Sequence, residues 1–207
     1  MPTNIGAKMS DKEIILKYLK DKSNEDEIIT LLQGQKKVLA DPKKILILLS
    51  DEYTSLIIKL AKNSKGKIKY HAIIILSKID FSISARNFYE LCRIAAEISN
   101  DKDGNIRQAS FILIKNLNKL MISLPIINKL QNASKAEVNL FYESFRTLFY
   151  RLHSLLHNRS DHDIRKSILK SLEIMLPKFY DMAKFWNDQE DIILANKIKD
   201  ELEKQTK

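Results

Sequence analysis

The sequence contains little cysteine, glycine or proline, and each shortage excludes a class of protein. The single cysteine rules out an intrachain disulfide and a multi-cysteine metal site, so we expect a reducing, cytoplasmic compartment. Only four glycines and four prolines are spread over 207 residues, which is too few for the many tight turns of an all-β fold. These shortages favour a protein built from helices.

Long hydrophobic runs are also missing. Apolar runs such as residues 45–49 and 72–76 are far shorter than the ~18 residues of a membrane-spanning helix. The N-terminal residues lack the apolar segment of a secretory signal. We therefore predict no membrane span.

The composition that remains is that of an ordinary folded domain. Hydrophobic residues make up 44% of the chain and charged residues 29%, which is not the composition of a disordered chain. The length suits one structural unit. We expect residues 1–10 to be a flexible N-terminal extension and residues 11–207 to be a single helical-repeat domain.

Apolar residues recur at helical spacing along most of the chain. Ser134 and Glu137 form the S-x-x-E pattern of a capping box, and Asp51 is expected to cap the helix after it. Pro177 is expected to open a short helix. We predict helices at residues 11–20, around 28–32, from 42, at 52–62, 67–79, 84–99, 105–120, 124–130 and 134–157, from 161 or 163, from 177, and at 188–203.

Two of these helices begin with the same pattern: an aspartate that can cap free amides, an apolar residue three positions later, and then an arginine. A degenerate third copy lies at Lys65–Lys69. The step from Ile68 to Ile106 matches the ~40-residue period of two-helix repeats, and the next step leaves room for roughly one extra helix. The pattern residues are Asp103, Ile106 and Arg107 in one copy and Asp161, Ile164 and Arg165 in the other.

This pattern resembles the second helix of HEAT repeats, in the HEAT-repeat (armadillo-like) α-solenoid family, over about residues 41–180. The resemblance implies an all-α fold, an irregular HEAT-like α-solenoid of stacked antiparallel helix pairs that bury their apolar faces against one another. Arg107 and Arg165 match the basic position of the family, and we expect them to bridge neighbouring turns. The resemblance implies nothing about chemistry, and an irregular helical bundle stays open as an alternative.

The sequence lacks a coherent catalytic constellation, so we expect no enzyme and no cofactor. It has no phosphate-binding loop, dinucleotide-binding turn or nucleophile elbow. His153 and His157 have the spacing of two metal ligands on one helix face, and Asp161, His162 and Asp163 follow. The glutamate of the H-E-x-x-H motif is missing, however, so we predict a polar helix end and no metal site.

The charge of the chain favours an anionic partner. The formal net charge is +9 at pH 7, which draws anions but identifies none. Two regions are candidates for anion or nucleic-acid binding: a lysine-rich turn, and a helix face that mixes aromatic and basic residues. That face is equally suited to packing against a neighbouring helix. The candidates are Lys65, Lys67 and Lys69 in the turn, and Tyr142, Arg146, Tyr150, Arg151, His153, His157, Arg159 and Arg165 on or near the helix.

We therefore predict a non-catalytic scaffold or adaptor that binds a macromolecular partner, with protein favoured and nucleic acid as the alternative. A lesser alternative is a HEAT-like DNA alkylation-repair glycosylase, which the chain resembles in size, charge and the placement of Trp186 between Asp181 and Asp188. We expect Phe179, Phe185 and Trp186 to seal a terminal helix pair instead. The oligomeric state stays open.

Overall fold

The computed structural model describes residues 10–38, 51–78, 84–121, 134–158 and 161–205. Most of the predicted N-terminal extension and the helices predicted from Pro42 and at residues 124–130 lie outside these ranges. Ser10, the last residue of that predicted extension, caps the first helix by accepting a hydrogen bond from the Glu13 amide. The division into residues 1–10 and 11–207 stays a prediction.

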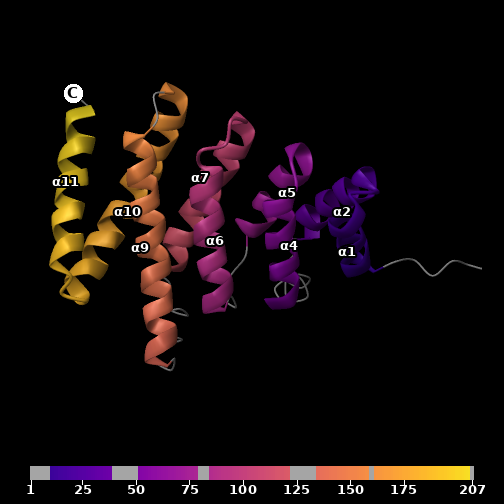
Figure 1. Ribbon diagram of the computed structural model, residues 1–207, viewed down its shortest axis with the longest axis horizontal. Coiled ribbons are helices and arrows are strands. Elements are labelled where there is room, and N and C mark those ends of the chain that lie inside the picture. Colours follow the sequence, from indigo (N-terminus) through magenta and orange to yellow (C-terminus); the bar gives the residue numbers. More distant parts are fainter. Residues whose placement is uncertain (1–9, 39–50, 79–83, 122–133, 159–160, 206–207) are drawn as a thin grey trace, which may run out of the picture.

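Every regular element in the described part is an α-helix, which confirms the all-α class. The described helices are α1 (Asp11–Asp21), α2 (Glu25–Val38), α4 (Asp51–Asn63), α5 (Gly66–Leu76), α6 (Ala85–Ile98), α7 (Gly104–Leu120), α9 (Lys135–His157), α10 (His162–Phe185) and α11 (Gln189–Gln205) (Figure 1). None of them is long and apolar enough to cross a membrane.

The helices stack in two rows along the long axis of the molecule (Figure 1). One row contains α1, α4, α6 and α9 in contact with one another, and the other contains α2, α5, α7 and α10. Each helix of the first row also packs against the next helix along the chain, and α11 packs against α10. The chain is therefore an irregular, HEAT- and armadillo-like α-solenoid, in which each pair buries apolar surface against its neighbours.

An aromatic pair joins neighbouring helices within one row, and small residues allow close contact between the two rows. The rings of Phe88 on α6 and Phe141 on α9 have centroids 5.0 Å apart, and both side chains are buried. Ala109 is fully buried, and the Ser110 hydroxyl donates to the Ala95 carbonyl at 2.9 Å, so α6 and α7 approach closely.

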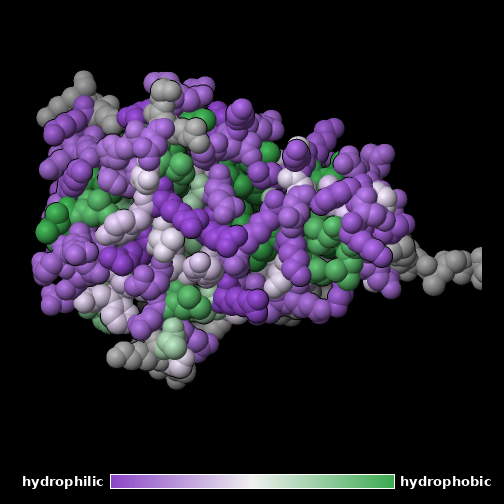
Figure 2. Space-filling model, viewed as in Figure 1, coloured by the Kyte–Doolittle hydropathy of each residue, from purple (hydrophilic) through white to green (hydrophobic). Residues whose placement is uncertain are grey.

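In Figure 2 the visible face is mainly hydrophilic, with hydrophobic residues gathered near α11 and near α1 and α2.

The repeated aspartate pattern marks the starts of α7 and α10. Asp103 accepts from the Asn105 amide at 2.8 Å, and Asp161 accepts from the amides of Asp163 and Ile164. The apolar residues of the pattern, Ile106 and Ile164, are buried. The arginines turn back along the chain: Arg107 donates to the carbonyls of Asp101 and Lys102, and Arg165 to that of Leu156. Each arginine thus ties the start of its helix to the chain that precedes it.

Two expectations about helix ends were wrong. Pro177 opens no separate helix but lies inside α10, which continues to Phe185. Pro177 and Glu173 are both exposed, so water can solvate the carbonyl that the missing amide leaves without a partner. Asp51 is the first residue of α4, and its carboxylate accepts from the Ser84 amide at 3.2 Å and the Asn87 side chain at 2.9 Å. Asp51 therefore links α4 to the start of α6.

Candidate functional site

The side chains singled out on α9 meet α11 in a buried polar cluster. Asp191 on α11 is fully buried and accepts hydrogen bonds from the hydroxyls of Tyr142 and Tyr150, both at 2.6 Å. The Arg146 guanidinium donates to both oxygens of the same carboxylate, at 2.9 and 3.0 Å. Three donors therefore surround one buried charge, which is what a buried carboxylate requires.

The spacing of the α9 residues explains the cluster. Tyr142, Arg146 and Tyr150 are four positions apart, so they lie on one helix face. Burial, together with the hydrogen bond and charge of Asp191, raises the pKa of Tyr150 to about 12 and raises the pKa of Tyr142 further. Burial opposes the charge of Arg146, but the hydrogen bond and charge of Asp191 outweigh it and raise its pKa. All three donors therefore keep their protons at neutral pH, and their polar ends face Asp191, an arrangement that argues against a role in binding nucleic acid.

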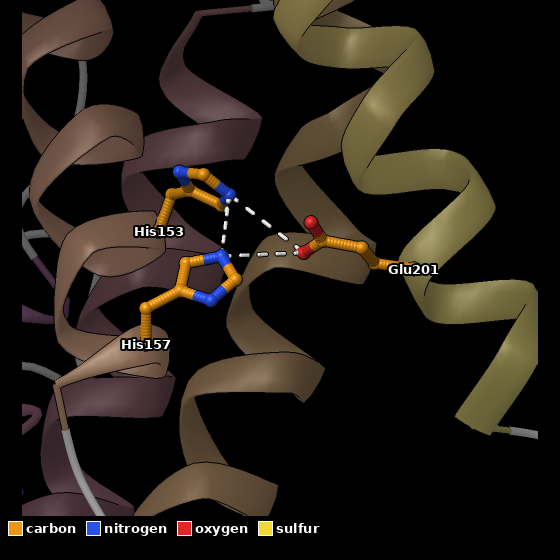
Figure 3. Close-up of side chains that lie close together, drawn as sticks. All are labelled: His153, His157 and Glu201. Carbon is orange, nitrogen blue, oxygen red and sulfur yellow. Dashed lines mark hydrogen bonds and ion pairs between the residues drawn. The ribbon is translucent and has the colours of Figure 1, made fainter.

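A second cluster lies further along the same two helices (Figure 3). The Nε2 atoms of His153 and His157 are 2.9 Å apart, and the Glu201 Oε2 of α11 lies 3.7 Å from the first and 3.5 Å from the second. Burial, and then the neighbouring His157, lower the pKa of His153. The sequence indicated the two histidines, but Glu201 was missed because no local pattern connects it to them.

The polar stretch after α9 does not join this cluster. Asp161 caps α10, while the side chains of His162 and Asp163 are 87% and 80% exposed. The nearest nitrogen and oxygen of His162 and Asp163 are 3.8 Å apart. The polar residues between positions 153 and 163 therefore do not form one site. His153 and His157 lie together on α9, Asp161 caps α10, and His162 and Asp163 are exposed.

The lysine-rich turn is partly used by contacts inside the array. Lys69 on α5 forms an ion pair with Asp101 at 2.6 Å, beside the start of α7. Lys65 and Lys67 are exposed on either side of Gly66, whose φ of 52° favours glycine. Only two of the three predicted lysines therefore project into solvent.

The remaining predicted arginines are dispersed. Arg151 lines a groove of about 390 Å³ with Glu97 of α6 and Ser154 of α9. Arg165 lies at a different groove, between α10 and α11. Arg159 lies outside the described residues. The structure does not bring Arg146, Arg151 and Arg165 together on one surface.

A groove between α10 and α11 has a volume of about 520 Å³. Leu169 and Leu202 supply apolar surface, while Arg165, Lys166 and Lys170 supply positive charge along one face of α10. Glu173 and Glu203 also line it. The signal in the sequence was the spacing of the basic residues on α10, but the contribution of α11 had no local signal.

The C-terminal aromatic residues have different environments. Phe179 is buried and stacks on Phe149 with ring centroids 3.9 Å apart, whereas Phe185 is 80% exposed. The prediction that Phe185 seals the terminal pair was therefore wrong. The ring centroids of Trp186 and Tyr142 are 5.6 Å apart. The Asp188 carboxylate accepts a hydrogen bond from the Asp191 amide at 3.1 Å. Asp181 is exposed on α10, whereas Asp188 accepts a hydrogen bond at the start of α11, so the two carboxylates that flank Trp186 in the sequence have different environments.

Comparison with known proteins adds only distant structural likenesses. No family model and no curated protein matches the sequence. The chain is similar to the designed armadillo repeat protein YIII(Dq)4CqI, with 11% identity, a TM-score of 0.39, and coverage of 78% of this chain and 98% of that one. It is also similar to the designed armadillo repeat protein YIII(Dq.V1)4CPAF in complex with peptide (KR)4, with 14% identity, a TM-score of 0.41, and coverage of 92% and 99%. Such likeness concerns the fold alone.

Proposed function

We propose that this protein is a non-catalytic helical-repeat scaffold that binds an acidic, partly apolar segment of a protein partner in the groove between α10 and α11. The observation that carries the proposal is the composition of that groove. Leu169 and Leu202 offer apolar contact, and Arg165, Lys166 and Lys170 offer positive charge beside it. A segment that combines carboxylates with apolar side chains complements both features.

The chain as a whole supports the same choice of partner. Its net charge of +9 attracts an acidic segment at long range. The two acidic residues in the groove, Glu173 and Glu203, favour a partner whose charges are spaced rather than continuous. We place this scaffold in the cytoplasm, in keeping with the single cysteine of the chain.

A protein partner is favoured over nucleic acid because the basic candidates do not form a track. Nucleic-acid binding draws its affinity from several phosphate contacts along one surface. Here Arg146 faces Asp191 and Lys69 faces Asp101, while Arg151 and Arg165 lie at separate grooves. Nucleic-acid binding by these residues stays the second candidate.

The absence of catalysis is part of the proposal. Cys92 is buried, and burial raises the pKa of its thiol, so it is unsuited to act as a nucleophile. Among the described residues, the fully buried carboxylate of Asp191 is surrounded by its own donors and has no access to a substrate. These features support a binding role.

The test is a selection of peptides from a random display library on the immobilised full chain. We expect selected peptides to combine Asp or Glu with Leu or Phe. Their affinity is then measured by fluorescence anisotropy for the wild type, for a Lys166→Glu/Lys170→Glu variant, and for a Lys65→Glu/Lys67→Glu variant. The two variants change the net charge equally, but only the first changes the groove.

A loss of at least about tenfold in the groove variant alone supports the proposal, because it separates local recognition from general charge attraction. Equal losses in both variants contradict the groove as the binding site. Labelled DNA and RNA are measured in parallel over a salt series. Tight binding of DNA or RNA with a steep salt dependence would indicate several phosphate contacts and would favour nucleic acid over protein as the partner.

A further inference from the structure

We propose that His153, His157 and Glu201 form a binding site for one Zn²⁺ ion, which fastens α11 to α9. The three residues were not all apparent from the sequence, and their role is separate from the groove between α10 and α11. Two ligands come from successive turns of α9 and the third from the last turns of α11 (Figure 3). The inference starts from the arrangement of their ligand atoms.

The distances fit tetrahedral coordination. Zinc lies about 2.0–2.1 Å from histidine nitrogens and about 2.0–2.2 Å from carboxylate oxygens, so neighbouring ligand atoms in a tetrahedral site are about 3.3–3.4 Å apart. The separations here are 2.9 Å between the two Nε2 atoms, and 3.7 and 3.5 Å from these atoms to Glu201 Oε2. Shifts of a few tenths of an ångström bring the three atoms to the three corners of one face of a tetrahedron around the ion.

The two Nε2 atoms lie within hydrogen-bonding distance of each other, at 2.9 Å, whereas Glu201 is further from both. At 3.5 and 3.7 Å the Glu201 carboxylate is beyond the usual N–H···O distance of about 2.7–3.2 Å from both imidazoles. Its side chain is 22% exposed and that of His153 is 15% exposed, so water solvates them only in part. A cation among the three atoms would satisfy both nitrogen lone pairs and the negative charge together.

The donor set selects the metal. Two imidazoles and one carboxylate suit zinc and its transition-metal neighbours, whereas magnesium and calcium prefer oxygen ligands alone. His157 is 50% exposed, which leaves the fourth position to a water molecule. Two histidines, one glutamate and a water molecule form the ligand set of known catalytic zinc sites, and the same four ligands would complete the coordination here.

The surrounding structure holds the ligands in place. His153 and His157 are four positions apart on a long helix, so their rings project from the same face. The Asp191 cluster fixes α11 against α9 at its other end through Tyr142, Arg146 and Tyr150. Glu201 is thereby presented to the histidines by a helix whose register is already set. A bound ion would add a second attachment between the two helices.

Zinc binding is measured by isothermal titration calorimetry on the full chain after chelator treatment and dialysis. The ligand variants are His157→Ala and Glu201→Gln, and the matched controls are His162→Ala and Glu190→Gln, since Glu190 is exposed on α11. His157 is half-exposed, and Glu201→Gln keeps the shape of the side chain, so both variants are expected to fold, which circular dichroism checks. Mg²⁺ serves as the comparison ion.

We expect one Zn²⁺ per chain, no Mg²⁺ binding, and a loss of at least about tenfold in zinc affinity for both ligand variants, since even outer-shell changes at metal sites cost about 10–100-fold. The two control variants should bind as the wild type does. No zinc binding by the folded wild type, or binding that neither ligand variant weakens, overturns the site.

The fastening of α11 is measured separately by amide hydrogen exchange. Zinc should slow exchange across α11 in the wild type and leave it unchanged in His157→Ala, because an ion bound to both helices opposes local opening. Zinc that binds without slowing exchange in α11 overturns the fastening. A peptide that binds the groove equally well with and without zinc would leave the two proposals independent.

Discussion

Helix α9 packs against α6 and α10 and also contacts α11, and the difference between its contacts with α6 and with α11 shows how this array combines stability with specificity. Toward α6 the contact is apolar, with Phe88 and Phe141 buried against each other. Toward α11 the hydrogen bonds and ion pairs run through Asp191 and Glu201. Apolar burial contributes free energy with little regard to direction, whereas a buried charge needs its donors in defined positions. The apolar interface holds the stack together, and the polar one fixes the position of α11.

The largest effect should come from breaking the apolar side. Phe141→Ala removes a fully buried ring and leaves a cavity, so we expect the free energy of unfolding to fall by about 3–5 kcal/mol. Urea denaturation followed by circular dichroism measures it. The neighbouring Leu140 is 37% exposed, and Leu140→Ala should change stability by only about 0.5 kcal/mol. Similar losses in the two variants would contradict the assignment of Phe141 to the core.

A smaller loss should follow from breaking the polar side. Asp191→Asn leaves Arg146 and two tyrosines without their shared charge, and we expect a loss of about 2–4 kcal/mol. The loss stays below that of a fully buried pair because Arg146 is 28% exposed. Hydrogen exchange should show faster opening confined to α11, with the exposed Asp200→Asn as the control. Faster exchange spread evenly over α6, α9 and α11 would contradict the separation of the two interfaces.

Alkaline titration should sharpen the comparison. Because the pKa of Tyr150 is raised to about 12 from 10, the unfolded chain releases this proton first as the pH rises. The associated stabilisation is fully present below pH 10 and is lost between pH 10 and about 12. Tyr150→Phe should make stability fall less steeply across this window in denaturation curves. Tyr180→Phe on α10 is the matched control, and an unchanged slope in Tyr150→Phe would refute the role of Asp191.

The smallest effect should come from an ion pair at the edge of an apolar interface. Lys69 and Asp101 link α5 to the start of α7, with side chains 19% and 22% exposed. Lys69→Gln should therefore cost about 0.2–1 kcal/mol, which thermal unfolding at low and high salt can resolve. The difference from wild type should shrink at high salt. A loss as large as that of Asp191→Asn would show that polar contacts inside the array matter as much as those of α11.

The sequence predicted the parts of this fold that depend on local physical rules. Helical spacing indicated the described helices, and Asp103 and Asp161 indicated where α7 and α10 begin, because capping involves residues only two or three positions away. Pro177 misled because the cost of a missing amide depends on solvent exposure. A continuous buried face that includes Leu172, Met175 and Phe179 keeps α10 intact across it.

The candidate sites depended on contacts that no local rule contains. Tyr142, Arg146 and Tyr150 formed a visible stripe, but the choice between solvent, nucleic acid and another helix rested on Asp191, which lies far along the chain. Glu201 was missed for the same reason. A stripe of polar residues on one helix predicts that these side chains have a hydrogen-bonding partner. Which residue or molecule that partner is can be read only from the folded structure.

The burial of Cys92 has a practical consequence for experiments on this molecule. It is the only cysteine in the sequence, and its thiol is both enclosed and raised in pKa. A cysteine introduced at an exposed position therefore reacts with maleimide dyes almost alone. A Ser154→Cys/Lys199→Cys variant has one such cysteine on α9 and one on α11. Labelled with a mixture of donor and acceptor dyes, it would report the separation of these helices by energy transfer, and the native thiol need not be removed.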